Sequence, residues 1–303
     1  MKEKVTAISI TLVFIILTWV FAGIRLEHFI LAGFCLCLFF LSDESKKLIV
    51  GLLPFVVFAI SYDWMRIYPN YLVNSIDTEG LYNLEKTLFG IPVADGSRIV
   101  PSEYFALHNN PVADFLAGVA YLGWVPVPVL FSVYLYFKGK KSIFLQFSLV
   151  FLFVNLLGFA IYYIHPAAPP WYAMAYGFEP IIGTPGCTAG LSRFDELVGF
   201  PVFSYIYGQN SNVFAAIPSL HAAYLVVALF YAIKGKCAKW VKITLATFMV
   251  GIWLTAVYTA HHYIIDVLLG ILCALSGIAL FQYGLLRITV YRKFLVKYYN
   301  YIQ

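Results

Sequence analysis

Long apolar runs alternate with short polar turns along almost the whole chain. A helix of about 20 residues crosses the ~30 Å hydrocarbon core of a bilayer, and several of the runs have about this length. The pattern therefore predicts an all-α, polytopic membrane protein with about eight transmembrane helices. We expect them at residues 5–24, 28–41, 48–65, 112–136, 142–164, 217–234, 240–260 and 263–286, the second of which is short for a span.

Most basic residues fall in alternate turns, on the same side as the N-terminus. The side of a membrane protein that carries the excess of Lys and Arg is usually cytoplasmic. With eight spans, both termini are therefore expected in the cytoplasm. Only five of the 20 basic residues fall on the other, extracytoplasmic side: Arg25, Arg66, Lys86, Arg98 and Arg193.

Two long segments are expected on the extracytoplasmic side, where long loops of a compact bundle usually serve function. Residues 66–111 mix polar and apolar stretches, including 81–90, which predicts short amphipathic helices along the interface. Residues 165–216 are rich in Pro, Gly and Tyr. We expect one integral membrane domain over 1–303, made of N-terminal helices 1–65, the interfacial segment 66–111, a catalytic core 112–286 and a cytoplasmic tail 287–303.

The composition agrees with this class of protein. The chain is 62% hydrophobic and 12% charged, with a mean hydropathy of +0.83, which leaves too few charges to cover a soluble domain. The net charge of +5 resides in the turns between apolar runs, so it does not indicate nucleic-acid binding. The five cysteines suggest neither a disulfide framework nor a metal site, and the first apolar run is expected to stay uncleaved.

Two histidines, His221 and His262, each begin an apolar segment, and one further apolar stretch separates them. The chain therefore crosses the membrane and returns, which places both imidazoles at the extracytoplasmic face. Asp266 follows His262 by four residues, a spacing that shares one helix face, so its carboxylate could accept a hydrogen bond from one ring nitrogen. A purely structural His–Asp pair is the alternative, but two histidines at one face favour acid–base or nucleophilic chemistry on a lipid.

The residues just before His221 predict the start of a helix. Pro218 suits the first turn, and Ser219 could cap it. The free N–H groups at such a start favour an anion such as a phosphate. On a helix, the neighbouring His261 would point roughly 100° away from His262, so we expect it to bind substrate or lie at the interface.

Other polar and aromatic residues expected on the extracytoplasmic side could serve either a structural role or substrate binding. His165, Trp171 and Tyr172 belong to a Pro-rich stretch that indicates an interface anchor or part of the substrate site. Asp63 and Arg66 lie three apart near a helix end, where they could pair with each other or bind polyol hydroxyls. The two remaining histidines are expected at the surface or interface: His28 and His108.

At these residues the chain resembles the phosphatidic acid phosphatase type 2 (PAP2) superfamily. In the second motif of that family Pro-Ser-x-His begins a helix, which matches Pro218–His221. In the third motif a histidine precedes an aspartate by four residues, which matches His262 and Asp266, followed by Gly270. The resemblance implies a six-helix core of the phosphatase type within the eight spans.

The inositol phosphorylceramide synthase branch of this family, the aureobasidin-sensitive type, is more similar still. The resemblance covers about residues 80–275, and its ordered motifs match residues 107–110, 168–172, 190–195, 214–221 and 261–263.

The chain departs from the phosphatase pattern at the phosphate-binding cations. The first motif, a lysine followed seven residues later by Arg-Pro, is missing, and Thr255 and Ala256 replace the Ser-Arg of the third motif. These departures argue against a plain lipid phosphatase and fit the synthase branch. Arg193, Arg66 and Arg98 are the extracytoplasmic candidates for the missing cation, and Arg193 is preferred because it lies within a family-like motif.

The branch implies a transferase that moves phosphoinositol from phosphatidylinositol to the primary hydroxyl of ceramide. His262 would attack the phosphodiester, and Asp266 would orient it in a phosphohistidine intermediate. His221 would protonate the departing diacylglycerol and later deprotonate the ceramide. No metal or other cofactor is expected, and the expected partners are the two lipids and the bilayer.

Three alternatives remain open. A lipid phosphatase or pyrophosphatase would use water as the acceptor, and a related transferase would move phosphoethanolamine or phosphocholine. A channel or transporter is disfavoured because, other than Asp63 and Asp266, the chain lacks the intramembrane charges that transport usually needs, and no interrupted helix is evident. Short loops and tails favour a bacterial inner membrane over a fungal Golgi membrane.

Overall fold

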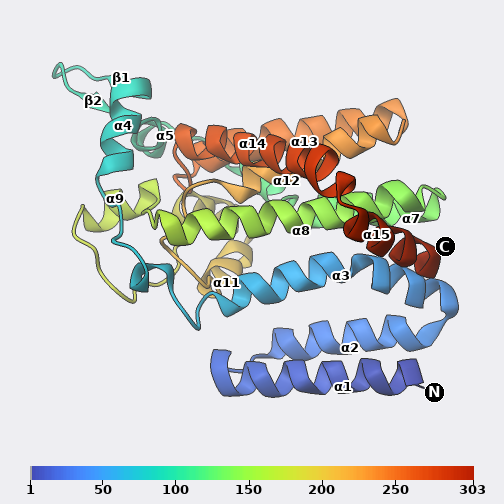
Figure 1. Cartoon of the computed structure of the whole chain (residues 1–303). Coiled ribbons are helices and arrows are strands. Elements are labelled where there is room, and N and C mark those ends of the chain that lie inside the picture. Colours follow the sequence, from blue (N-terminus) through green and yellow to red (C-terminus); the bar gives the residue numbers. More distant parts are fainter. Residues whose placement is uncertain (1) are drawn as a thin grey trace.

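The computed structural model describes residues 2–303, and most of them are helical. The long helices run side by side, with both termini at one end of the bundle and short elements at the other (Figure 1). The apolar helices are α1 Lys2–Leu17, α2 Leu26–Leu41, α3 Asp43–Trp64, α6 Pro111–Leu122, α7 Pro126–Phe137, α8 Lys141–Ile164, α12 Leu220–Lys234, α13 Lys239–Tyr258 and α14 Ile264–Ala279. π-Helical turns extend α1 over Thr18–Ala22 and α14 over Leu280–Gly284, and a 3₁₀ turn at Leu285–Arg287 follows the latter.

All the predicted apolar segments are helical, but not all are long enough to span a membrane. Five helical segments qualify by length and hydropathy: Lys2–Ala22, Asp43–Trp64, Lys141–Ile164, Lys239–Tyr258 and Ile264–Arg287. The helices α2 and α12 have only 16 and 15 residues. The protein is thus a polytopic helical membrane protein, with five or six spans by this criterion in place of eight.

The prediction of one continuous helix over 112–136 is wrong. The segment breaks between Leu122 and Pro126, and its two halves, α6 and α7, are bent by 46°. Proline has no N–H to donate and clashes with the preceding turn, so Pro126 begins a new helix and does not continue the old one. The structure therefore contains an interrupted helix. A transporter is no longer disfavoured by the lack of one.

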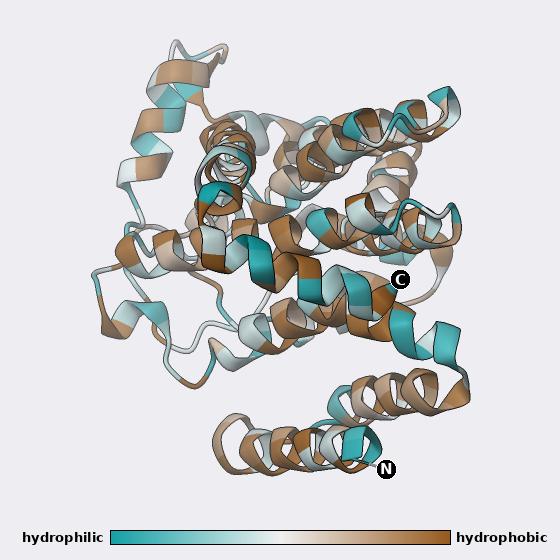
Figure 2. Cartoon of the chain, turned by 45° about the vertical axis from the view of Figure 1, so that its right-hand side comes forward, coloured by the Kyte–Doolittle hydropathy of each residue, from teal (hydrophilic) through white to brown (hydrophobic). Residues whose placement is uncertain are grey.

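The core forms where α12 packs against α8, α13 and α14. Aromatic side chains fill the space between α3, α8 and α12, where the ring centroids of Phe55 and Phe151 are 4.5 Å apart and those of Phe151 and Tyr224 are 4.6 Å apart. By contrast, α1 buries none of its residues, and Figure 2 shows its mostly hydrophobic ribbon at the edge of the bundle. Exposed apolar helix faces are expected where a protein contacts lipid.

The predicted interfacial segments do carry short helices, and these gather at the end of the bundle away from the termini (Figure 1). A two-stranded antiparallel hairpin, in which Ile91 pairs with Ile99, projects at the outer edge of this end beside α4 (Figure 1). The C-terminal tail is also helical, as α15 Thr289–Ile302, and packs on α3 and α8. The short elements are a 3₁₀ turn Asn70–Leu72, α4 Gly80–Phe89, β1 Ile91–Pro92, β2 Arg98–Ile99, α5 Pro101–Leu107, α9 Pro170–Tyr176, a 3₁₀ turn Ala189–Leu191, α10 Ser192–Val198 and α11 Val202–Gly208.

Candidate active site

His221 is the second residue of α12, at the end of the bundle that carries the short elements. Ser219 caps this helix, because its hydroxyl accepts a hydrogen bond from the N–H of Ala222 at 3.4 Å. Pro218 precedes the cap and does not lie in the first turn, which corrects the sequence-based expectation. The cap fixes the helix start and therefore the position of the His221 ring.

His262 lies in the link between α13 and α14 and not on a helix, so the predicted helical relation between His261 and His262 is wrong. The carbonyl of Ala256, in the last turn of α13, accepts hydrogen bonds from the N–H groups of His261 at 3.0 Å and His262 at 2.9 Å. Both rings therefore stay close to the end of α13, and both are about 95% buried.

Asp266 is fully buried in the first turn of α14. One of its carboxylate oxygens, Oδ2, accepts the Tyr263 N–H at 2.9 Å and lies 3.4 Å from Nδ1 of His262. The His262–Asp266 contact is within ion-pair distance but is not aligned as a hydrogen bond. The carboxylate thus faces Nδ1 of His262 and leaves Nε2 of the same ring to face elsewhere.

The starts of α12 and α14 are joined directly. The Ser219 N–H donates to the Asp266 carbonyl at 2.9 Å. Gly270 permits this approach, because a Cβ at that position would collide with the Ser219 carbonyl. This backbone contact brings the two motifs, which are about 40 residues apart in sequence, to one place.

The two histidine rings meet at this junction. Nδ1 of His221 lies 3.2 Å from Nε2 of His262, a hydrogen-bond distance, and 3.3 Å from the hydroxyl of Tyr121. Trp124, in the break between α6 and α7, packs its ring edge-on against His221 with centroids 4.6 Å apart. Burial lowers the pKa of His262 to about 4, so its ring is neutral at neutral pH.

A cavity of about 250 Å³ opens beside the rings of His221, His261 and His262. Its walls are mostly aromatic, and one side carries the amides of the 209–212 loop. Among the described residues 2–303, none that lines this cavity is an Asp, Glu, Lys or Arg. The aromatic and amide residues are Phe58, Tyr62, Trp124, Tyr162, Trp171, Tyr207, Tyr224, Gln209, Asn210 and Asn212.

Comparison of the sequence with known protein families identifies the family of this chain. Residues 99–280, which include both histidine motifs, match the PAP2 superfamily. The chain belongs to the PAP2 superfamily. No solved structure matches the chain.

The chain is similar in sequence to several sphingolipid synthases. A phosphoinositol dihydroceramide synthase of Bacteroides thetaiotaomicron is 59% identical over 302 residues, which cover 100% of this chain and 99% of the relative. The inositol phosphorylceramide synthase of Candida albicans is 29% identical over 59% of this chain. The corresponding catalytic subunit AUR1 of Saccharomyces cerevisiae is 26% identical over 80% of it. The matched regions span 40% and 58% of these two fungal proteins.

The three arginines considered as replacements for the PAP2 cations do not line the cavity. Arg193 donates to Asp114 at 2.6 Å and lies over the Tyr258 ring, in a neighbouring pocket. Arg98 donates to the carbonyl of Gly90. Arg66 donates hydrogen bonds to the Gln209 carbonyl and the Ser211 hydroxyl of the 209–212 loop. These guanidinium groups therefore have partners within the protein in this structure.

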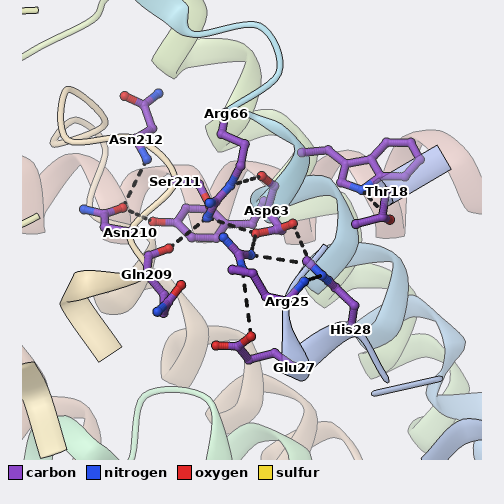
Figure 3. A network of polar contacts seen from close by, with 12 residues as sticks. Thr18, Arg25, Glu27, His28, Asp63, Arg66, Gln209, Asn210, Ser211 and Asn212 are labelled. Atoms are coloured by element: carbon purple, nitrogen blue, oxygen red, sulfur yellow. Dashed lines mark hydrogen bonds and ion pairs between the residues drawn. The ribbon is translucent and has the colours of Figure 1, made fainter. Parts of the chain in front are cut away.

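Asp63 belongs to an ionic network that joins α2 to α3 (Figure 3). Its carboxylate contacts the guanidinium of Arg25, the Nε2 of His28 at 3.0 Å and the guanidinium of Arg66 at 3.0 Å. The predicted pairing of Asp63 with Arg66 is present, and neither residue lines the cavity. The expectation that His28 lies at the surface is wrong, because this network buries it.

The aromatic pair expected at the membrane interface is buried within the protein. Trp171 lines the cavity, whereas Tyr172 packs behind it with its hydroxyl bonded to the Glu179 carbonyl and the Ile181 N–H. His165 stays half-exposed and pairs with Asp77 at 3.1 Å, outside the cavity. His108 is exposed, as expected.

Sequence reasoning missed Tyr121, Trp124 and Glu85. Glu85 on α4 is fully buried, and its carboxylate accepts the N–H groups of Ile264 at 2.9 Å and Ile265 at 3.2 Å. It thereby caps the helix that carries Asp266. No local pattern marks these three residues, since each acts through a contact distant in sequence.

Proposed function

We propose that this chain transfers phosphoinositol from phosphatidylinositol to the primary hydroxyl of a ceramide or dihydroceramide and releases diacylglycerol. The observation that carries the proposal is the 3.2 Å approach of His221 and His262 beside one cavity. The full-length similarity to a phosphoinositol dihydroceramide synthase supports the choice of head group and acceptor.

In the first step, Nε2 of His262 attacks the phosphorus of the donor. A P–N bond forms, the P–O bond to diacylglycerol breaks, and His221 gives a proton to the departing oxygen. Nε2 is the attacking atom because Nδ1 faces Asp266. The buried carboxylate holds the ring in place and offsets the positive charge that the imidazole gains. For this step the phosphate replaces the direct contact between the two rings.

In the second step, the acceptor hydroxyl attacks the same phosphorus. The new P–O bond forms as the P–N bond breaks, and His221 takes the hydroxyl proton, which restores both rings. Positioned acid–base catalysis of this kind supplies roughly 10²–10⁴-fold in rate. The enclosing aromatic walls and the 209–212 loop exclude water, which would otherwise compete with the lipid hydroxyl.

His261 is the best-placed further substrate ligand. Its Nδ1 lies 3.0 Å from the hydroxyl of Thr259, and its Nε2 has no hydrogen-bond partner among residues 2–303. The ring lines the cavity next to His262. A phosphate oxygen there would accept a hydrogen bond from this nitrogen. His261 would then contact the phosphate in place of the Lys and Arg residues that the PAP2 motifs usually supply. Trp171 and the Ser219-capped start of α12 complete this part of the binding site.

The starts of α12 and α14, which carry the site, lie at the end of the bundle away from both termini (Figure 1). Because the Lys-rich and Arg-rich turns lie at the end with the termini, we place the site on the extracytoplasmic face of a bacterial inner membrane.

Purified protein in liposomes with phosphatidylinositol and ceramide tests the proposal. We expect an inositol-phosphate sphingolipid that is absent when His262→Ala replaces the wild-type chain, although this variant still folds in detergent. Release of soluble inositol phosphate at the same rate with and without ceramide would instead establish a phosphatase. Transfer from phosphatidylethanolamine or phosphatidylcholine in place of phosphatidylinositol would reassign the head group.

A further inference from the structure

The 209–212 loop supplies the side-chain amides that line the cavity. Gln209, Asn210 and Asn212 line the cavity, and Ser211 faces α3 (Figure 3). Their side-chain amides are neutral and offer both donors and acceptors. Since no charged residue among 2–303 lines this cavity, its polar wall is suited to a neutral ligand rich in hydroxyls.

Tyr62 on α3 and Arg66, two residues beyond the end of this helix, hold the loop in place. Arg66 donates to the carbonyl of Gln209 and the hydroxyl of Ser211, both at 3.0 Å. The Tyr62 hydroxyl donates to Oδ1 of Asn210 at 2.7 Å. The Asp63 carboxylate in turn fixes Arg66. These hydrogen bonds hold the loop in a fixed position. The supporting helix, α3, lies outside residues 99–280, which match the PAP2 superfamily.

Asn212 has a buried donor without a partner. Its Oδ1 accepts the Phe214 N–H at 3.1 Å, whereas its Nδ2 finds no hydrogen bond among residues 2–303. The residue is 8% exposed and lines the cavity. Buried polar groups are nearly always hydrogen-bonded, so a free amide in a cavity wall indicates a ligand that accepts from it.

We propose that the 209–212 loop is the head-group subsite and binds the hydroxyls of the inositol ring, with Tyr62 and Arg66 as positioning residues. The proposal rests on the function proposed above and extends it to recognition of the donor. An amine head group would find no carboxylate in this wall.

Steady-state kinetics with separately varied phosphatidylinositol and ceramide test the subsite. Asn212→Asp keeps the acceptor for Phe214 but removes the donor, and Asn212→Leu removes the donor without adding charge. We expect both to raise KM for phosphatidylinositol about 10-fold and to leave KM for ceramide within about 2-fold. Soluble inositol 1-phosphate should compete with the donor lipid in the wild type and lose this effect in both variants.

Tyr62→Phe tests the support from α3, because it deletes only the hydroxyl that holds Asn210. We expect a smaller rise in the same KM, with thermal unfolding in detergent unchanged. Asn300→Asp, on exposed α15 at the far end, is the matched control and should behave as wild type. An unchanged donor KM in both Asn212 variants, or a rise in the ceramide KM instead, overturns the subsite. A wild type that makes no phosphoinositol lipid overturns the proposed function itself.

Discussion

At the scale of residues, the site depends on two imidazoles, with Nδ1 of His221 3.2 Å from Nε2 of His262. The pairing of His221, His262 and Asp266 follows from their spacing in sequence, because two apolar segments place both histidines at one face. The manner of the pairing does not follow, since His262 reaches Asp266 from a link and not along a helix. Tyr121 contacts His221 only through the tertiary structure, so no local pattern predicts it.

The loss of activity at low pH reports the protonation of His262, whereas the proton that His221 must donate affects the alkaline side of the profile. A nucleophile must be neutral, and burial lowers the pKa of His262 to about 4, so lowering the pH protonates it only near that value. Between pH 7 and 5.5 we expect kcat/KM to fall less than about 2-fold on this account. A histidine with the ordinary pKa of about 6.5 would lose about 10-fold over the same range. The pH profile of kcat/KM in detergent decides between the two.

At the scale of elements, the helices were largely predictable and their interruptions were not. Apolar runs of sufficient length indicate helices wherever they occur, but the break before Pro126 lies inside such a run and leaves hydropathy unchanged. This break places Trp124 against His221, so it contributes to the site. The links and the long loops lack periodicity, and their geometry depends on contacts such as that of Glu85 with α14.

Glu85 is expected to act as a positioning residue for the catalytic aspartate. Glu85→Ala leaves two N–H groups at the start of α14 without their acceptors, which should cost about 1–3 kcal/mol of stability and most of the activity. Glu85→Gln keeps one acceptor and should retain an intermediate share of both. Thermal unfolding and transferase assays measure the two effects.

Glu196→Ala, an exposed carboxylate on α10, is the matched control for this pair. Wild-type activity in Glu85→Ala would show that α4 does not position Asp266.

At the scale of the whole molecule, the charge distribution and the fold agree. Both termini lie at one end, and the short elements lie at the other, together with the starts of α12 and α14 beside the two histidines (Figure 1). The sequence therefore predicted which residues share a face of the protein. It also predicted that the second helix, α2, is short, but it did not predict that α12 has only 15 residues.

Cysteine labelling in intact cells tests this orientation. In a chain without its five native cysteines, Ser97→Cys in the hairpin should react with a membrane-impermeant maleimide. Lys138→Cys, in an exposed turn at the other end, should react only after permeabilisation. The reverse pattern would place the histidines on the cytoplasmic side.

Mass spectrometry of the peptide that carries His262 tests the central claim most directly. After incubation with phosphatidylinositol alone, we predict a phosphoinositol adduct on His262 that disappears when ceramide is added and never forms in His262→Ala. An enzyme that forms product while His262 stays unmodified under rapid quenching, or an adduct on His221, would contradict the account.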